Sequence, residues 1–367
     1  MNRLIFKIPL LVALTAVVLF HTTLVRSNPS EDPAGISARR AADFVHNVIE
    51  AGRTTYSLVI VDRLAKSHSL KATEDWKRKN TLPLPAQFFM MSSRMSNQRG
   101  IGLRYRLMSL WPINPKNAPS SPTEKSGLNQ VAEKPDQPFT WVVQKNGIWY
   151  YEAIYPDKAV AESCVSCHNH HPKSRKTDFK IGDVLGGIVI DLPLGRRFNK
   201  KPSDPFMFPL EVVADYVHSI LESNRAVYAK HIVDRLESKR VMSAIENWEQ
   251  GKTLMLPAQF LMNTSRLVRE KGLGLDFQLI SLWPINMKNS PANEFQQMGL
   301  ETVDYHPIRP YTGRVKLGRK QFFQAIYADL AVAPACVECH NAHPNSPKRD
   351  FKLLDVIGGV VITLPIH

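Results

Sequence analysis

The hexapeptide SLWPIN occurs twice in the chain, at residues 109–114 and again at residues 281–286. The two copies lie 172 positions apart (281 minus 109). The same separation relates VDRL at 61–64 to VDRL at 233–236, and PAQF at 85–88 to PAQF at 257–260. A single long period of constant length is typical of a duplicated domain rather than of a solenoid built from short units. The sequence therefore predicts two copies of one domain with equal loop lengths.

Composition limits the class of protein. The chain has 367 residues, enough for two or three domains. A hydrophobic fraction of 44% with 22% charged residues indicates globular protein and excludes a disordered or multi-span chain. Lys and Arg number 47 against 33 Asp and Glu, a net charge of +14. This excess favours acidic partners, namely an anionic membrane, nucleic acid or an acidic protein. Of these we expect an acidic protein or a membrane surface, and no nucleic acid.

The N-terminus predicts export. Arg3 and Lys7 precede an apolar run at residues 8–20, which is typical of a secretory signal. Extended to residue 25 the run is also long enough for an uncleaved anchor, so both readings stay open for residues 1–26. We expect the protein in the periplasm or on the extracytoplasmic face of the membrane. The two domains are predicted at residues 37–194 and 210–367, joined by a basic, proline-containing linker at 195–209.

Each copy is expected to start with helices and to continue with strands. Residues 37–65 show an amphipathic helical period, weakened in the middle by Gly52. Shorter helices are expected at 73–80 and 86–97, a strand at 103–108, and a long loop at 111–138. Asn146-Gly147 predicts a hairpin turn, and residues 184–192 form a last apolar strand. The predicted fold class is α+β, with helices followed by an antiparallel sheet.

Both copies contain a Cys-x-x-Cys-His pentapeptide, CVSCH and CVECH. This spacing is that of covalent haem c attachment, because two thiols can bind the two haem vinyl groups while the histidine supplies an axial nitrogen to iron. The sequence thus predicts two covalent haem c groups. The motif residues are Cys164, Cys167 and His168 in the first copy and Cys336, Cys339 and His340 in the second.

Other uses of these cysteines compete with haem attachment. A redox dithiol does not need the following histidine in both copies. A shared four-cysteine zinc site would join pairs that lie 169 positions apart (336 minus 167), well beyond the usual gap of about 15–20 residues. Zinc bound within one unit by Cys164, Cys167 and His168 or His171 is sterically awkward but stays open. Structural disulfides between the copies are the last alternative. Export, duplication and the absence of a spare cysteine favour haem.

The residues after the pentapeptide extend the pattern to CHNxHP, SxKxDFK and DVxGG in both copies, with Leu354 in place of Gly182 in the second. This combination resembles an exported, PAS-like c-haem domain family that occurs as the input part of bacterial kinases and cyclases and as free-standing cytochromes. The resemblance covers residues 40–194 and 212–366. It implies a PAS-like fold with one haem c in each copy.

The resemblance extends to an arginine and a tyrosine in each copy, which we expect in the haem pocket. They are Arg53 and Tyr56, and Arg225 and Tyr228. The arginines could bind the anionic haem propionates. Because attachment uses all four cysteines, a distal cysteine ligand is excluded, and the distal side holds a histidine, a methionine or an open site that could bind a gas or small anion. The candidates kept in both copies are His46 with His218 and Met90 with Met262, against the alternatives of a surface histidine and a core methionine.

The function expected from these observations is electron transfer by a di-haem c-type cytochrome of the cell envelope, with an acidic redox partner. The alternative is a haem-based redox or gas sensor that acts through a separate partner. No pairing of a nucleophile with a base and no phosphate-binding loop is visible, so we expect no enzyme. A di-haem peroxidase is the weakest alternative, because two nearly identical units do not suggest a division of labour.

Overall fold

The computed structural model describes residues 35–195 and 206–366. The export segment predicted at residues 1–26 lies outside these ranges, as does the middle of the predicted linker. The end of that linker forms a strand, because residues 207–209 pair antiparallel with residues 35–37. Both repeats belong to one compact unit. The predicted α+β fold in two tandem copies is confirmed.

The two repeats have the same order of helices and strands. The first contains β1 (Gly35–Ser37), α1 (Ala38–Thr54), the π-helix η1 (Thr55–Asp62), α2 (Arg63–Lys66), α3 (Trp76–Lys79), α4 (Pro85–Asn97), β2 (Arg104–Met108), η2 (Pro115–Asn117), α5 (Pro122–Glu133), β3 (Phe139–Lys145), β4 (Ile148–Lys158), α6 (Glu162–His170) and β5 (Val184–Gly195). The second contains β6 (Met207–Pro209), α7 (Leu210–Tyr228), the π-helix η3 (Ala229–Val233), α8 (Asp234–Ser238), η4 (Trp248–Gln250), α9 (Pro257–Glu270), β7 (Asp276–Ile280), η5 (Met287–Asn289), α10 (Glu294–Tyr305), β8 (Tyr311–Leu317), β9 (Lys320–Leu330), α11 (Pro334–Ala342) and β10 (Val356–Pro365).

The long first helix of each repeat is continuous but changes its winding. In the first repeat α1 passes into η1 and then α2, so the helix predicted at residues 37–65 is present with a π-helical segment inside it. Ser37 begins it, because its hydroxyl accepts the backbone N–H of Arg40. Gly52 does not interrupt it: a side chain there would collide with the amide of Asn224 on α7. The glycine therefore permits close contact between two helices.

Each repeat has one antiparallel four-stranded sheet, in the order β2-β5-β4-β3 and β7-β10-β9-β8. The hairpin predicted at Asn146-Gly147 joins β3 to β4, and both turn residues have positive φ angles, 52° and 77°. The loop expected at 111–138 instead contains α5. Its start has a helix signal that the proline-rich composition obscured: the hydroxyl of Ser121 caps the helix, and Pro122 occupies its first position.

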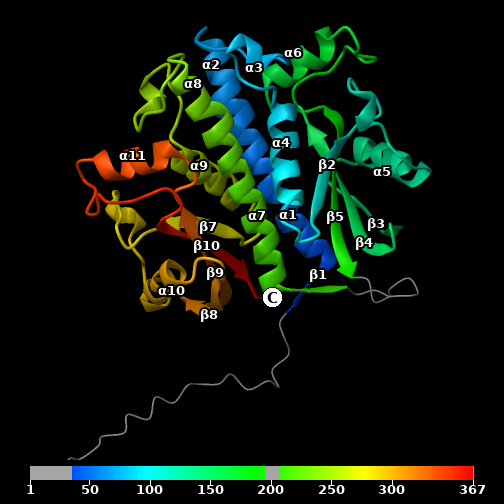
Figure 1. Ribbon diagram of the computed structural model, residues 1–367. Helices are drawn as coiled ribbons and strands as arrows, with labels where there is room; N and C mark the ends of the chain where they lie inside the picture. The colour runs from blue at the N-terminus through cyan, green and yellow to red at the C-terminus, as the bar shows by residue number, and fades with distance from the viewer. Residues whose placement is uncertain (1–34, 196–205, 367) are drawn as a thin grey trace, which may run out of the picture. The chain divides into compact units, whose positions relative to one another are not determined.

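The helices of the two repeats pack on one another. Figure 1 shows α1, α4 and α7 side by side between the two sheets, and α1 also contacts α9. One core cluster joins both repeats, with Phe44 and Val48 from α1 and Val217 and Ile220 from α7 among its fully buried members. Burial of each such side chain contributes about 1.5–3 kcal/mol, so the repeats stabilise each other.

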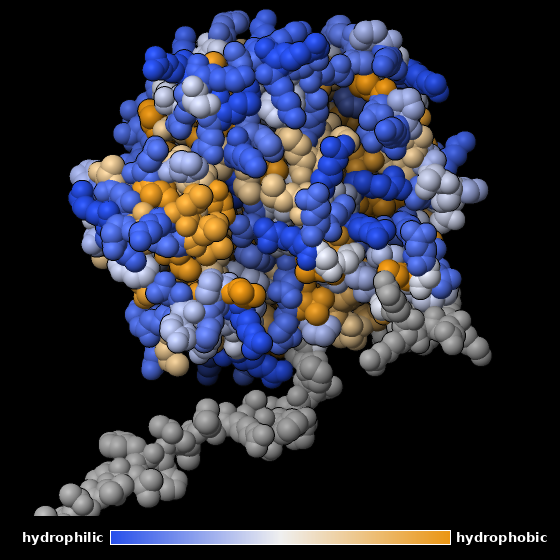
Figure 2. Space-filling model, in the orientation of Figure 1, coloured by the Kyte–Doolittle hydropathy of each residue, from blue (hydrophilic) through white to orange (hydrophobic). Residues whose placement is uncertain are grey.

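The face of the molecule drawn in Figure 2 is mostly polar, with a local exception. Figure 2 shows apolar side chains gathered near α11. Two exposed apolar residues in the segment after α11 are Leu353 and Leu354, which are 54% and 65% exposed. Among the helices of the described ranges, none has both the length and the apolar character needed to cross a bilayer.

Candidate functional site

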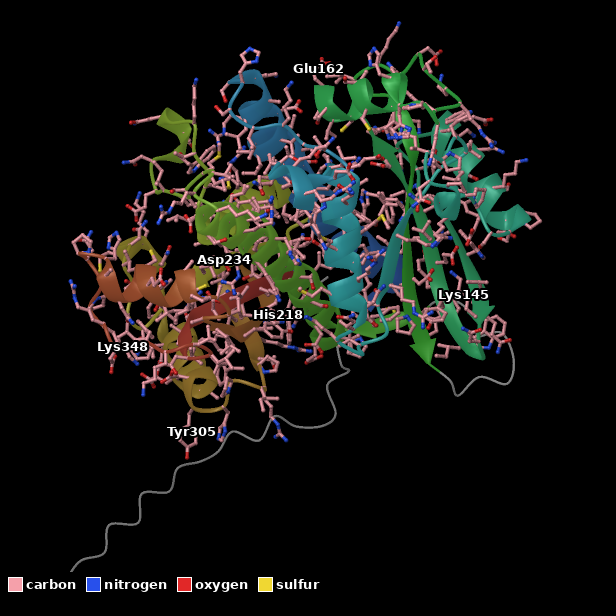
Figure 3. All side chains as sticks on the ribbon, turned by 45° about the horizontal axis from the view of Figure 1, so that its top comes forward. Lys145, Glu162, His218, Asp234, Tyr305 and Lys348 are labelled. Atoms are coloured by element: carbon pink, nitrogen blue, oxygen red, sulfur yellow. The ribbon has the colours of Figure 1, made fainter. Side chains whose placement is uncertain are left out.

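The first Cys-x-x-Cys-His motif lies on α6, whose start is held by the π-helix. Asp62, the last residue of η1, accepts hydrogen bonds from the backbone N–H groups of Glu162 and Ser163 at 2.9 and 3.2 Å. The first amides of a helix have no partner inside the helix. The N-cap residue Ala161 offers no side-chain acceptor, so the carboxylate of Asp62 caps α6 from outside. Figure 3 shows Glu162 on this helix.

The end of α6 is fixed to the segment that follows it. The side-chain amide of Asn169 donates to the carbonyl of Phe179 at 2.8 Å and accepts its backbone N–H at 2.9 Å. The Phe179 ring meets the imidazole of His168 nearly at right angles, with ring centroids 5.6 Å apart. The motif histidine is thereby oriented by residues that the asparagine positions. Asn341, Phe351 and His340 repeat this arrangement in the second copy.

A cavity of about 450 Å³ lies against α6. Cys164, Cys167 and His168 all line it, so both thiols and the imidazole face one space. The cysteines form no disulfide. Apolar and aromatic side chains from other elements complete much of the lining, including Trp76, Leu84, Met90, Leu107, Trp111 and Leu185. Such a mixture of apolar walls and a few converging polar groups is typical of a cofactor site.

A buried ion pair lies in the lining. Arg53, from the end of α1, contacts the carboxylate of Asp157 on β4, and both side chains are buried. Burial raises the pKa of Asp157, and the adjacent guanidinium opposes this rise. The Nε atom of Arg53 is buried and has no hydrogen-bond partner among the described residues. Arg53 also lines the cavity, so its positive charge is placed to attract an anionic group there.

The protonation states of the motif residues suit metal and thioether chemistry. Burial lowers the pKa of His168 to about 4, assisted by the positive charge of Arg53. A neutral imidazole keeps a nitrogen lone pair available for a metal ion. Burial also raises the pKa of both Cys164 and Cys167, so the two thiols stay protonated near neutral pH.

One loop, which contains α3, forms part of the cavity wall. We call residues 71–82 the Trp76 loop; its ends are joined by hydrogen bonds between Leu82 and the backbone of Lys71 and Thr73. Trp76 and Glu74 line the cavity. Glu74 also lies 3.3 Å from Nε2 of His171, three positions after the motif histidine. The loop is thus tied directly to the end of α6.

The structure brings only some of the predicted pocket residues to the cavity. Met90 and Arg53 line it together with the motif residues. Tyr56 does not: its hydroxyl donates to the carbonyl of Pro83 at 2.7 Å, and its ring stacks on Phe88 in a separate core cluster. Its hydroxyl is therefore occupied away from the cavity.

His46 is also placed outside the cavity lining. It stacks on Tyr155 with ring centroids 4.0 Å apart and planes within 7°, and burial lowers its pKa to about 4. His218 stacks on Tyr327 in the same way, at 3.9 Å. Each histidine belongs to the first helix of its repeat, and its ring packs against a tyrosine of that repeat's sheet. Of the two pairs of candidate distal ligands, the first repeat brings Met90 to the cavity and not His46.

The second repeat reproduces the contacts around the motif. Arg225 pairs with Asp329, and His343 lies 3.2 Å from Glu246. Tyr228, like Tyr56, donates its hydroxyl to a backbone carbonyl, that of Met255 at 2.9 Å. Met262 lies on α9 and packs against the shared core.

Three residues of the site were not singled out from the sequence. Asp157 pairs with Arg53, Asp62 caps α6, and Trp76 lines the cavity. Each has an identical partner 172 positions later, at Asp329, Asp234 and Trp248. Identity between the repeats was the signal that could have found them. Their roles depend on contacts between distant segments, which the repeat alone does not reveal.

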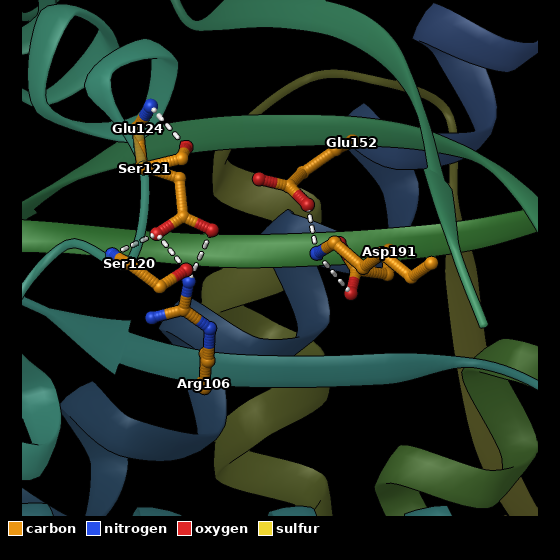
Figure 4. A network of polar contacts seen from close by, with 7 residues as sticks. Arg106, Ser120, Ser121, Glu124, Glu152 and Asp191 are labelled. Carbon is orange, nitrogen blue, oxygen red and sulfur yellow. Dashed lines mark hydrogen bonds and ion pairs between the residues drawn. The ribbon is translucent and has the colours of Figure 1, made fainter.

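The repeats differ in charge away from the site. On the sheet of the first repeat, Lys145 contacts Glu152 and lies 2.9 Å from Asp191; burial raises the pKa of Glu152 (Figure 4). In the second repeat, Gln324 donates to the hydroxyl of Thr363 at 3.0 Å at the equivalent positions. The uncharged pair shows that the repeated fold does not require this charge cluster.

The observed donor set fits a haem c group. Two protonated thiols three positions apart and a neutral imidazole border a cavity that has apolar walls and is also lined by Arg53. The thiols could form the two thioether links, His168 could supply the axial nitrogen, and Arg53 could bind a propionate.

Comparison with known proteins gives one family. The family model described as Tll0287-like matches residues 31–193 and, a second time, residues 210–365. No curated protein and no solved structure matched the chain. The two matched segments cover most of the sequence and coincide with the two repeats. The chain therefore belongs to the Tll0287-like family of c-type haem domains, of which it contains two tandem copies.

Proposed function

We propose that this protein is a di-haem c-type cytochrome of the cell envelope that transfers electrons to or from an acidic redox protein. The observation that carries the proposal is the repeated constellation of two free thiols and a histidine on one short helix, which in the first repeat lines a cavity of about 450 Å³. A haem c held there would supply one-electron redox chemistry. The protein's own residues would hold its ring, orient the axial imidazole and neutralise propionate charge.

The packing of the repeats supports electron transfer within the chain. Aromatic rings form an unbroken series from one repeat to the other: Tyr56 on Phe88, Phe88 on Phe260, and Phe260 on Tyr228. The centroid distances are 4.2, 5.8 and 4.6 Å. Two haems attached to such a body would keep a fixed separation, which suits a relay with one haem in each repeat. The net charge of +14 would guide an acidic partner.

The test is export of the full chain in a host that matures c-type cytochromes. We expect a mass increase of two haems, and one haem in each of two variants, Cys164→Ser/Cys167→Ser and Cys336→Ser/Cys339→Ser. The reduced spectra should not change with carbon monoxide, and a reduced acidic redox protein should reduce both haems. Protein without attached haem would refute the proposal.

The same measurement separates the alternative functions. A Soret band that shifts with carbon monoxide would favour the haem-based sensor, for which the PAS-like resemblance argues, and would require a separate output partner. Turnover of peroxide with one haem open and the other closed would favour a peroxidase. We propose no catalytic residue for this chain.

A further inference from the structure

Arg63 connects the first repeat to the second. It lies at the start of α2, directly after the π-helix, and its guanidinium donates to the carbonyls of Trp248, Gly251 and Thr253, at 3.3 and 2.9 Å for the first two. It also lies over the indole ring of Trp248 at 4.9 Å. These contacts hold residues 243–254, which we call the Trp248 loop and which is the second repeat's equivalent of the Trp76 loop.

Arg235 makes the reciprocal connection. Its guanidinium donates to the carbonyls of Trp76 and Thr81 at 3.4 and 2.6 Å, and it lies over the Trp76 ring at 4.8 Å. One arginine of each repeat therefore binds the tryptophan loop of the other repeat. Five donors in a rigid planar fork make arginine suited to binding several carbonyls while stacking on an indole.

The Trp76 loop and the Trp248 loop border the proposed haem sites. Trp76 and Glu74 line the cavity of the first repeat, and Glu74 pairs with His171 at the end of the attachment helix. In the second repeat Glu246 makes the same pair with His343. A chain of contacts thus runs from an arginine of one repeat, through the loop, to the attachment helix of the other.

The neighbouring residue links each arginine to its own repeat. Asp62 caps α6 of the first repeat, and Arg63, the next residue, grips the Trp248 loop of the second. Both sit at the end of η1, and π-helical turns are frequent at functional positions. Two adjacent side chains of one helix thereby contact the motif helix of the first repeat and the Trp248 loop of the second.

We propose that Arg63 and Arg235 are positioning residues that act across the boundary between the repeats: each fixes the loop that borders the other repeat's haem. The inference rests on the proposed attachment of haem at both sites. Its consequence is a crossed phenotype, in which a substitution in the first repeat alters the haem of the second. Loss of one charge-assisted hydrogen bond should let the loop open at least about tenfold more often.

The experiment uses the two single-haem variants described above. Arg63→Gln is introduced into each, and the absorption spectrum and carbon monoxide binding are recorded. We expect the chain that carries only the second haem to become able to bind carbon monoxide, or to show a shifted absorption spectrum. The chain that carries only the first haem should match its parent. Arg235→Gln should give the mirror result.

Hydrogen exchange of the chain with both haems supplies an independent readout. Arg63→Gln should accelerate exchange at residues 243–254 at least about tenfold and leave residues 71–82 unchanged. Lys271→Ala is the matched control, because Lys271 also crosses the boundary, 2.9 Å from Glu50, and is not among the residues lining the cavity. It should leave both loops and both spectra unchanged. Arg63→Lys, which keeps one donor and the charge, should recover part of the protection.

Opposite results are distinguishable. If Arg63→Gln alters the first haem as strongly as the second, or if neither loop exchanges faster, the positioning role is refuted while the cytochrome proposal stands. If no haem is attached, the proposed function fails, and the exchange measurement still decides whether the arginines hold the loops. Should Arg63→Gln not fold, Arg63→Lys carries the same comparison with a smaller expected effect.

Discussion

Met90 and His46 are both kept in the two repeats, but their surroundings assign them different roles. The side chain of Met90 borders the cavity that Cys164 and His168 also line. His46 is stacked on Tyr155 and is half-buried between helix and sheet. A thioether in the haem cavity can serve as an axial ligand and would raise the reduction potential relative to two histidines. The structure places Met90, and not His46, in the cavity lining, and we propose Met90 as the distal ligand.

We predict that Met90→Leu opens one of the two haems. If the Met90 sulfur binds iron, its loss leaves a free coordination position. Carbon monoxide should then shift the Soret band of half of the haem in the reduced protein. His46→Gln should leave the spectrum unchanged, because His46 is not among the residues that line the cavity. Absorption spectroscopy with and without the gas checks both. A spectral change with His46→Gln and none with Met90→Leu would reverse the assignment.

A second histidine, His218, stabilises a buried carboxylate. Burial by itself raises the pKa of Glu222, but His218 at 3.3 Å, together with Arg225 and Arg99, lowers it to about 2. The unfolded chain has an ordinary glutamate pKa near 4.5. Because the folded pKa is the lower one, Glu222 contributes up to about 3 kcal/mol above pH 4.5, and this contribution is lost as the pH falls from about 5 towards 2.

Glu222→Gln should therefore make the protein less sensitive to acid. Between pH 5.5 and pH 3.0, the parent should lose about 2 kcal/mol more of its free energy of unfolding than the variant does. Urea unfolding at the two pH values measures this difference. Glu270→Gln, in an exposed pair with Arg266 on α9, should keep the parent's pH dependence. Equal acid sensitivity of Glu222→Gln and the parent would contradict the assigned pKa.

At the scale of single elements, α6 and α11, the helices that carry the Cys-x-x-Cys-His motifs, differ in how they begin. Two backbone N–H groups at the start of α6 donate to Asp62. In α11 the first position is Pro334, which has no N–H to donate, and burial raises the pKa of the equivalent carboxylate, Asp234. We predict that Asp62→Ala costs about 1–2 kcal/mol of stability and speeds hydrogen exchange in α6.

Asp234→Ala is the internal control for this cap. It should cost clearly less and leave the exchange of α11 nearly unchanged, because one of the two donors is missing there. Urea unfolding and hydrogen exchange of the two attachment helices give the comparison directly. Equal losses in the two variants would mean that the aspartates stabilise something other than the helix start.

The elements also show which features the sequence can predict. The long first helix, the Asn146-Gly147 hairpin and the last strand follow from local periodicity and turn chemistry, and all three are present. The local sequence indicates that Gly52 weakens the helix. In the structure Gly52 lies against Asn224, which is 172 positions away, and no local pattern predicts that contact. The motif residues Cys164, Cys167 and His168 are evident from one pentapeptide, and the structure places all three at the cavity. The loops that border them are held by the other repeat, and no local pattern indicates that.

At the scale of the whole molecule, the two repeats are joined by reciprocal contacts. Asn47 donates to the carbonyl of Val268 at 3.1 Å, while the hydroxyl of Ser219, the residue equivalent to Asn47, lies 2.8 Å from that of Ser96. Phe88 and Phe260, both 1% exposed, meet edge to face between the repeats. Because neither repeat can bury these side chains alone, the body should unfold as one cooperative unit.

The Phe88–Phe260 contact provides the test of that unity. Phe88→Ala and Phe260→Ala should each cost about 3–5 kcal/mol, and each should lower the stability of both repeats together, with a single urea transition. The double variant should cost less than the two separate losses combined, by about 1 kcal/mol, since the rings contact each other. Phe88→Ala combined with Phe295→Ala should be additive, because Phe295 packs on Tyr311 against the sheet of the second repeat. The opposite result would be two separate transitions, one for each repeat, together with additive losses at Phe88 and Phe260. The repeats would then be independent domains, and a relay between their haems would need another explanation.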